Sequence, residues 1–491
     1  MAAPPQHPSE PSRIGRVLPD VEVFAQSIAY MGPSATIAIA PAIVAATAGN
    51  GVWFAYLVST VCMLGVAYTV GHFARRVSGT GSLYTFSAKG FGPLGGLISG
   101  ATLLLGYFVG AATVTITGSI YFGAFLGELG IDGTTTIANI AIFLALAGGS
   151  TALSLRGVYV ATRVALFIEI VSIAAIVLVL IVTIADRGTV VDVDQLTLEG
   201  TSVSGIALGV VIAIVGLAGF ESAASLGLEA KDPYRAVPRA MLRSVALTGA
   251  LLIAAAYAVT LGFDGPEGLL ASTTPLNDLT ADAGLGGMAW LIDLGVTFSA
   301  FAALTASVNA GSRLLLSMGR ERVLPQSLGS IHRAFRTPHV ALAIGFPVVA
   351  GPPVVLLATG SSAIEAVSYL AFLSSLAMAA SYGLVSLAAP LFLRRRRALT
   401  GLAAAVAVAA AAAMAFVIFK TLSPAPPAPQ KYLPFAVLGA VCLGAAWFAA
   451  LRAVAPERTR DVGSFSEDGE LAPAAQDPAG LVAAGAAETA R

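Results

Sequence analysis

Long apolar runs separated by short polar segments fill most of this chain. A helix that crosses a membrane needs about 20 mostly apolar residues, and by that measure the pattern predicts twelve such helices. They are expected at approximately 22–48, 51–73, 94–126, 137–155, 161–185, 203–228, 241–262, 287–318, 340–360, 363–392, 399–419 and 432–452. The third, eighth and tenth runs are longer than the lipid requires, so we expect them to tilt or to extend beyond it.

The amino-acid composition indicates to which class of protein these helices belong. Of the 491 residues, 57% are hydrophobic and only 11% are charged, whereas charged residues make up about a quarter of a soluble domain. The chain is therefore predicted to be an all-α polytopic membrane protein. Cys62 and Cys442 both lie within apolar runs, where a cysteine is typical of a small buried hydrophobe rather than of a disulfide or a metal ligand.

The distribution of positive charge predicts the orientation. With a cytoplasmic N-terminus, all of the 27 Lys and Arg residues except Arg187, Lys420 and Lys431 fall in cytoplasmic segments. This is the asymmetry of the positive-inside rule, and a miscounted helix would invert every later loop. We therefore expect a multi-pass protein of the plasma (inner) membrane with both termini in the cytoplasm. The segments on the other side, at 186–199 and 264–282, are acidic instead.

The first predicted helix carries Gly32-Pro33 at its centre. Proline removes a backbone hydrogen bond and clashes with the preceding turn. The simplest interpretation is a proline kink. The alternative is a true break in the helix, which survives in a membrane where the freed backbone groups line a cavity.

The sixth predicted helix has a second anomaly, because the carboxylate Glu221 directly follows a stretch that contains Gly216 and Gly219. A charge at the centre of a membrane helix costs about 2.5–3.5 kcal/mol on insertion scales. Glu221 is interpreted either as a structural carboxylate that binds loose backbone amides or as a protonatable gate or ligand for a cationic group.

The two anomalies lie five predicted helices apart. This is the spacing expected of two inverted repeats of five helices, whose broken members meet at the middle of the bilayer. The chain then divides into a polar N-terminus (1–20), a first repeat (21–185), a second repeat (203–392), two peripheral helices (399–452) and a disordered cytoplasmic tail (456–491). The pairing favours a binding site built from both breaks.

Other polar residues within the apolar runs have two interpretations each. Glu169 either makes an interhelical hydrogen bond or takes part in ion coupling, and Ser299, Thr297 and Thr305 either pack helices or bind a ligand. Asp293 and Glu365 are expected to be solvated at the ends of their helices. Aromatic residues can close over a substrate or simply pack: Tyr107, Phe220, Tyr369 and Phe372.

Motifs of ATP-driven or enzymatic proteins were not found. The chain has no Walker loop, no dinucleotide-binding glycine motif and no His-Glu-x-x-His. We therefore expect no enzyme activity, no cofactor, no metal and no nucleic-acid partner. The expected partners are a small molecule and the lipid bilayer, with a monomer or a homodimer both left open.

Four stretches resemble one family, the amino acid–polyamine–organocation transporters. GFESAASLGLEAKDPYRAVPRAM is similar to the family's sixth-helix signature, and SGTGSLYTFSAKGFGP to its segment after the second helix. SVNAGSRLLLSMGRERVLP and RTPHVAL are similar to the segments that precede its ninth helix. The similarity covers about residues 20–395, with the stretches in the family's order.

The resemblance implies two inverted five-helix repeats, broken helices 1 and 6, and alternating access around a central site. It also implies the residues of that site and of coupling to H⁺ or Na⁺. The substrate-binding residues are expected to be Met31, Gly32, Pro33, Ser34, Ala35, Thr36, Tyr107, Gly219, Phe220, Glu221 and Ser222. The coupling or gating residues are expected to be Glu169, Glu221 and Ser299.

Two residues depart from the family pattern at positions that bear on the substrate and on the coupling ion. Val215 stands where arginine/agmatine-type antiporters carry a gating tryptophan, and Glu169 lies near the position of a lysine in proton-coupled relatives. The sequence thus predicts a secondary transporter for an amino acid or a related amine, with proton coupling. The alternatives are a polyamine importer, an amino acid/amine exchanger, and a sensor or channel on the same fold.

Overall fold

Helices form the regular structure throughout residues 18–423 and 430–465, which the computed structural model describes, apart from one bridge between Leu18 and Ala230. Eleven stretches of these residues are long and apolar enough to cross a membrane. The prediction of an all-α polytopic membrane protein is confirmed. The first stretch, Asp20–Ala74, has 55 residues, more than twice the length of one crossing. A count of twelve depends on dividing it at Gly49–Gly51 and stays a prediction.

The first half of the chain supplies one broken crossing helix and four long unbroken ones. Its helices are α1 (Asp20–Met31), α2 (Pro33–Ala48), α3 (Val52–Ala74), α4 (Leu83–Phe91), α5 (Pro93–Glu128), α6 (Thr136–Arg156), α7 (Val158–Asp186) and α8 (Val193–Thr197). At 36 residues, α5 is about 54 Å long and extends beyond the roughly 30 Å of hydrocarbon.

The second half is also built around long helices, of which α13 and α15 pack on α5. Its helical segments are α9 (Val203–Ala213), η2 (Ile214–Leu217), η3 (Phe220–Leu226), α10 (Pro233–Gly262), α11 (Pro266–Ala271), α12 (Pro275–Asp282), α13 (Ala289–Arg320), α14 (His339–Ala358), α15 (Ala363–Arg395), α16 (Gly401–Leu422), α17 (Leu433–Val454) and α18 (Pro456–Asp461).

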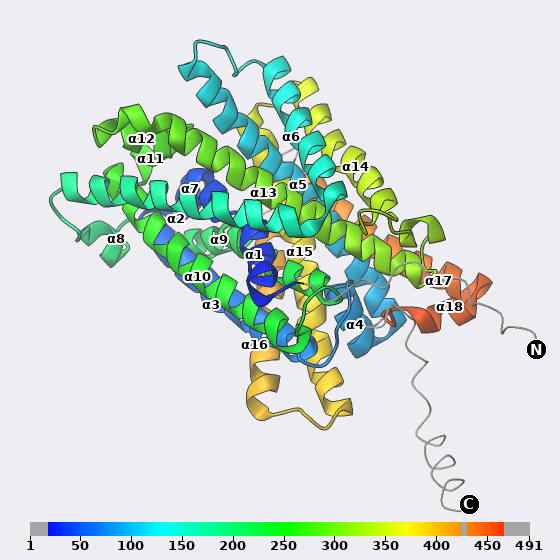
Figure 1. The fold of residues 1–491 in the computed structure, drawn as a ribbon. Coiled ribbons are helices and arrows are strands. Elements are labelled where there is room, and N and C mark those ends of the chain that lie inside the picture. The colour runs from blue at the N-terminus through cyan, green and yellow to red at the C-terminus, as the bar shows by residue number, and fades with distance from the viewer. Residues whose placement is uncertain (1–17, 424–429, 466–491) are drawn as a thin grey trace, which may run out of the picture.

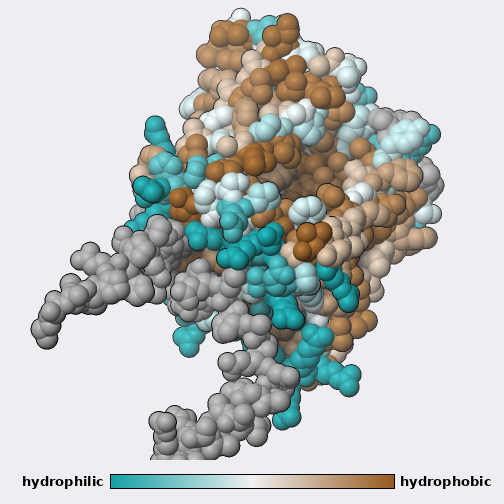
Figure 2. Space-filling model, turned by 90° about the vertical axis from the view of Figure 1, so that its right-hand side faces the viewer, coloured by the Kyte–Doolittle hydropathy of each residue, from teal (hydrophilic) through white to brown (hydrophobic). Residues whose placement is uncertain are grey.

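The two ends of the molecule differ in the short elements that they carry. In Figure 1, α8, α11 and α12 lie at one end of the long helices, and α4 and α18 lie at the other. Figure 2 views the molecule from the side on which α17 and α18 lie, and hydrophilic residues gather there beside the grey segments while hydrophobic residues lie mainly above them and to their right. This surface pattern is the one expected of a helix bundle in lipid with a polar end.

The first break is a true interruption of the helix. Gly32 takes the left-handed conformation (φ +50°), and α1 ends before it while α2 begins directly after it. Pro33 is then the first residue of α2, where the missing proline N–H costs nothing. The interpretation as a simple kink is therefore wrong.

The second break follows α9 and the 3₁₀ turn η2. Ala218 is extended (φ −74°, ψ 155°) and Gly219 has φ +96°, before the chain resumes as η3. A left-handed backbone is accessible to glycine without strain. Both breaks predicted from the sequence are thus present, one in each half of the chain.

Two predictions about the periphery need adjustment. The span of α17 is only 11% buried inside the protein, as expected of a peripheral helix, whereas α16 is 33% buried and packs on α15 and α3. The expected disorder from Pro456 onward is wrong for 456–465, because α18 and a buried segment after it are ordered. The remaining tail, 466–491, and the N-terminal segment 1–17 lie outside the described residues.

Candidate functional site

An apolar cavity of about 380 Å³ lies between the two breaks and α5, α13 and α15. None of the residues that line it carries a charge. Its apolar wall includes Ile39, Val114, Val211, Val215, Phe372 and Met378, and its hydroxyl groups include those of Thr36, Thr113, Ser307, Ser374 and Ser375. The volume lies within the range of small-molecule sites, which combine apolar walls with a few polar groups.

The cavity runs from the breaks toward the end of the molecule that is remote from α4. Its far wall includes the exposed Ala46 near the end of α2, Val367 near the start of α15, and Gln430 before α17. At the near end Tyr30 lines the cavity and packs over the second break. A Cβ atom added to Gly219 would lie 1.6 Å from Tyr30 Cδ1. The ring of Tyr30 therefore forms a floor that requires glycine beneath it.

The predicted substrate-binding residues separate into two groups. Met31, Ala35 and Thr36 line the cavity. The rest of the predicted set are not among its lining residues: Gly32, Pro33, Ser34, Tyr107, Gly219, Phe220, Glu221 and Ser222. Sequence reasoning missed Tyr30, Ser307 and Met378, which face the cavity. Of these three residues, only Tyr30 could have been found from the sequence, because it lies two residues before the Gly-Pro break.

Glu221 lies fully buried with one of its two carboxylate oxygens unpaired. Oε2 accepts a hydrogen bond of 2.5 Å from the hydroxyl of Tyr382 on α15, and that hydroxyl accepts one of 2.9 Å from the Gly219 N–H. Oε1 makes no hydrogen bond of standard geometry among the described residues, and the nearby hydroxyl of Tyr107 interacts with this carboxylate. Buried polar atoms are usually satisfied, so Oε1 can accept a hydrogen bond from Tyr107 or from a ligand.

Tyr382 is a second residue that the sequence did not reveal. Its ring stacks on that of Phe220 with 5.4 Å between centroids, so it ties α15 to the second break. A tyrosine in a long apolar run has no local signal that separates this role from packing.

A second buried carboxylate meets the first break. Oε1 of Glu169 on α7 accepts a hydrogen bond of 2.9 Å from the Ser34 N–H, and the hydroxyl of Ser299 on α13 accepts one of 3.2 Å from the Ala35 N–H. These are amides of the first turn of α2, which carry partial positive charge at a helix N-terminus. The structure thus brings the predicted residues Glu169 and Ser299 together at the first break.

The other predicted polar residues make more ordinary contacts. Thr297 and Thr305 both donate to backbone carbonyls one turn earlier on α13. Glu365 is exposed in a capping box with Ser362, as expected of a solvated residue. The prediction that Asp293 is solvated is wrong, because its side chain is buried and accepts a hydrogen bond of 2.7 Å from Asn277 on α12. A short helix folds over this end of α13 and covers it.

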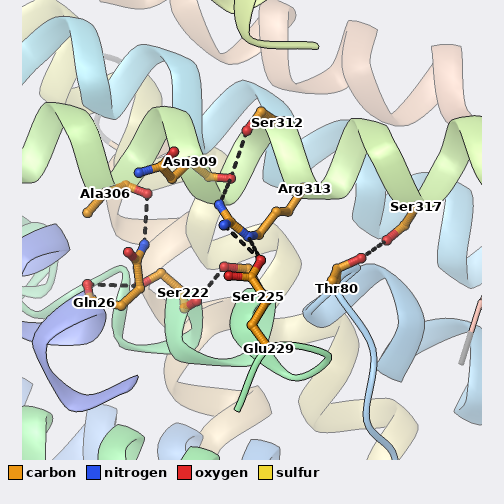
Figure 3. Close-up of polar contacts among 10 residues, drawn as sticks. All are labelled: Gln26, Thr80, Ser222, Ser225, Glu229, Ala306, Asn309, Ser312, Arg313 and Ser317. Carbon is orange, nitrogen blue, oxygen red and sulfur yellow. Dashed lines mark hydrogen bonds and ion pairs between the residues drawn. The ribbon is translucent and has the colours of Figure 1, made fainter. Parts of the chain in front are cut away.

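Below Glu221, polar contacts between distant elements close the near end of the site (Figure 3). Gln26 Nε2 on α1 donates to the Ala306 carbonyl of α13 at 2.9 Å, and Arg313 on α13 pairs with Glu229 at 2.8 Å. Thr80, in the loop after α3, bonds Ser317 on α13 at 2.6 Å. The first two contacts join α13 to segments near the two breaks, and the third joins it to the loop after α3.

The loop 78–82 completes this closed layer. Ser78 donates to the Gly227 carbonyl at 2.9 Å, and Ser82 donates to the Glu221 carbonyl at 3.0 Å. The loop therefore lies directly against the segment that carries Glu221. The site as a whole is accessible at one end and sealed at the other, with the two breaks between.

Comparison with known proteins yields a family and several relatives. The model of the family described as "Amino acid permease" matches residues 23–463. A branched-chain amino acid permease, BcaP of Bacillus subtilis, is 25% identical over 310 residues, which cover 60% of this chain and 66% of that protein.

Two further relatives differ from BcaP in what their names say they carry. The low-affinity putrescine importer PlaP of Escherichia coli is 26% identical over 328 residues, 65% of this chain and 70% of the importer. A methylthioribose transporter of Bacillus subtilis is 26% identical over 309 residues, 60% and 65% of the two chains. All of these relatives are named as membrane transport proteins, and none as an enzyme.

Proposed function

We propose that this chain, which belongs to the amino acid permease family, is a secondary active transporter that carries an amino acid or a related amine across the plasma membrane by alternating access. The observation that carries the proposal is the site between the two broken helices, open at one end and sealed at the other. Broken helices that meet in a cavity are the usual substrate sites of such carriers.

The orientation follows from the charges. The sealed end lies next to α4 and the arginine-rich segments, and positive segments remain in the cytoplasm. The cavity then faces outward, and we interpret this conformation as an outward-facing state with its cytoplasmic end closed. Transport requires that the contacts of α13 with Gln26, Glu229 and Thr80 separate while the outer end closes.

The chemistry of the cavity favours a neutral amino acid with an apolar side chain. A diamine such as putrescine would place two ammonium groups in a cavity whose wall has no carboxylate, and burying an unpaired charge is costly. An amino acid has only one ammonium group, and Glu221, a buried carboxylate close to the lining residue Tyr30, is its proposed partner. The apolar side chain then packs against residues such as Val211 and Val215.

A polyamine or cationic amine is the second candidate. The segments that would face outward are acidic, at Asp192, Asp194, Asp278 and Asp282 among others, and such a surface concentrates cations near the cavity mouth. The relative named as a putrescine importer agrees with this alternative. Competition between labelled leucine and excess putrescine separates the two.

Coupling is proposed to run through Glu169. Its carboxylate occupies the Ser34 amide, a group that would otherwise be available to the carboxylate of a substrate. Protonation of Glu169 weakens this hydrogen bond, because a neutral carboxyl is the poorer acceptor. Protonation of Glu169 therefore makes the Ser34 amide available to the carboxylate of the substrate. Proton binding and substrate binding thereby favour each other.

The test is uptake of labelled leucine into proteoliposomes with and without an imposed pH gradient. Wild type is expected to take up leucine faster with the inward proton gradient. Glu169→Gln, which keeps an oxygen for Ser34 but cannot ionise, is expected to retain binding and lose the response to the gradient. A wild type that is indifferent to the gradient, or a Glu169→Gln variant that still responds fully, would remove Glu169 from the coupling.

A further inference from the structure

A buried carboxylate outside the cavity organises the sealed end of the protein. Glu321 directly follows α13 and has no exposed surface. Its Oε1 accepts a hydrogen bond of 2.9 Å from the Phe465 N–H, and its Oε2 accepts one of 2.9 Å from the Gly463 N–H and another from the Tyr84 hydroxyl. Two of its three partners therefore belong to the C-terminal segment Val462–Phe465.

This segment packs tightly although it lies beyond the last crossing helix. Val462 is 7% exposed and Phe465 only 4%. Gly463 is left-handed (φ +73°), and a Cβ atom there would lie 2.6 Å from Ala88 Cβ on α4. A segment that is held by buried backbone hydrogen bonds and close packing is an ordered part of the fold.

The segment also touches the loop that seals the site. The Phe465 carbonyl oxygen lies 3.2 Å from the position of a Cβ atom on Gly79. On its other side the loop 78–82 contacts Gly227 and Glu221 through Ser78 and Ser82. The loop is therefore placed between the C-terminal segment and the second break.

We propose that Val462–Phe465 is a latch that holds the loop 78–82 against α13, and that it must leave Glu321 before the cytoplasmic end of the transporter can open. The latch bridges α4 and the loop on one side and the end of α13 on the other, so these elements cannot separate while both amides are bonded to Glu321. The inference rests on the proposed alternating access.

The experiment measures opening rather than transport. Ser225, fully buried in η3, the segment that the loop contacts at Glu221, is replaced by cysteine (Ser225→Cys) with Cys62→Ala and Cys442→Ala, and inside-out vesicles are labelled with a membrane-impermeant maleimide. Ending the chain after Asp461 removes the latch, whereas ending it after Phe465 removes only the residues beyond it and is the matched control. Gly463→Ala in the full-length chain adds one methyl group against Ala88.

The latch predicts faster labelling, by at least about fivefold, in the chain ended after Asp461 and in Gly463→Ala; fivefold corresponds to about 1 kcal/mol. The chain ended after Phe465 is expected to label at the wild-type rate. Equal rates for the two shortened chains, together with an unchanged rate in Gly463→Ala, would overturn the latch. Should the shorter chain fail to fold, Gly463→Ala decides alone.

The outcome is separable from that of the proposed function. A protein that shows the predicted labelling but transports no substrate would contradict the proposed transport function and support the proposed latch. A protein that transports leucine, but whose labelling is unchanged both in the chain ended after Asp461 and in Gly463→Ala, would contradict the proposed latch and support the proposed transport function.

Discussion

Glu221 is the residue for which the sequence left two interpretations open. A purely structural carboxylate would be expected to satisfy both of its oxygens with backbone amides at the break. Instead Oε2 accepts from the Tyr382 side chain, and Oε1 makes no hydrogen bond of standard geometry among the described residues, at a depth where a charge costs about 2.5–3.5 kcal/mol. The geometry favours the interpretation of Glu221 as a ligand or gate.

Gly219 tests whether the floor of the cavity is as tightly built as the contacts indicate. Gly219→Ala is expected to lower the melting temperature by several degrees, because it combines a strained φ with a direct overlap of Tyr30. Gly360→Ala is the matched control: Gly360 has the same φ of +96°, and a Cβ atom there meets nothing within 4 Å. Thermal unfolding of both variants in detergent gives the answer.

The control isolates the contact from the backbone strain. Both substitutions carry the conformational cost of alanine in the left-handed region, about 1 kcal/mol, so their difference reports the packing of Tyr30 on the break. If the two variants melt at the same temperature, Tyr30 does not pack on Gly219 as described.

Single residues also mark the limit of sequence reasoning. Asp293 was expected to be solvated because it lies near a helix end, but α12 folds over it and Asn277 pairs with it. Tyr30 and Tyr382 define the floor of the site, yet an aromatic ring in an apolar run has the same sequence signal whether it packs or binds. Tertiary contacts decide these cases.

Among the elements, the broken helices were the most predictable. Gly32-Pro33 and Gly219 act on the backbone itself, through a left-handed conformation and a missing donor, so their effect is local. The long α5, α13 and α15 were predictable for the same reason, because apolar length needs no tertiary information.

The C-terminal segment was predicted wrongly because its order is not local. Residues 456–465 have few large apolar side chains, and their composition is typical of disorder. Glu321, about 140 residues earlier in the chain, supplies the acceptor for two of their amides. No local pattern encodes such a pairing.

The latch should respond to pH. Burial raises the pKa of Glu321 to about 7, against the hydrogen bonds from Tyr84 and the two amides and the nearby charge of Lys89. Tyr84 and Lys89 are the titratable groups that act on it, both on α4, and Val462–Phe465 contains none. The latched state therefore holds a proton more tightly than a released state in which water reaches the carboxyl, for which the ordinary pKa is 4.5.

This difference in the pKa of Glu321 determines how the stability of the latch changes with pH. The latch is most stable below about pH 4.5, weakens as the pH rises toward about 7, and changes little beyond that. Labelling of Ser225→Cys, normalised to the denatured protein at each pH, is expected to accelerate from about pH 5 to about pH 7 and then level off. Glu321→Gln is expected to show a flat profile, and an unaltered slope in that variant would exclude Glu321 as the sensor.

At the scale of the whole molecule, the two ends of the site are in opposite states. One end holds an apolar cavity, while the other is closed by the contacts of α13 with three other segments. The family shows that the protein is a membrane transporter, and the uncharged cavity adds the expectation of a neutral amino acid. Composition predicted the class, whereas the uncharged wall became evident only when helices from both halves were placed together.

Counterflow in proteoliposomes tests this account most directly. Vesicles loaded with unlabelled leucine are diluted into a trace of labelled leucine, with excess unlabelled valine or putrescine outside in parallel samples. A transporter of apolar amino acids is expected to accumulate label transiently above its equilibrium level, and valine but not putrescine is expected to abolish the overshoot. The absence of any overshoot would contradict alternating access, and an overshoot abolished by putrescine alone would contradict the proposed substrate.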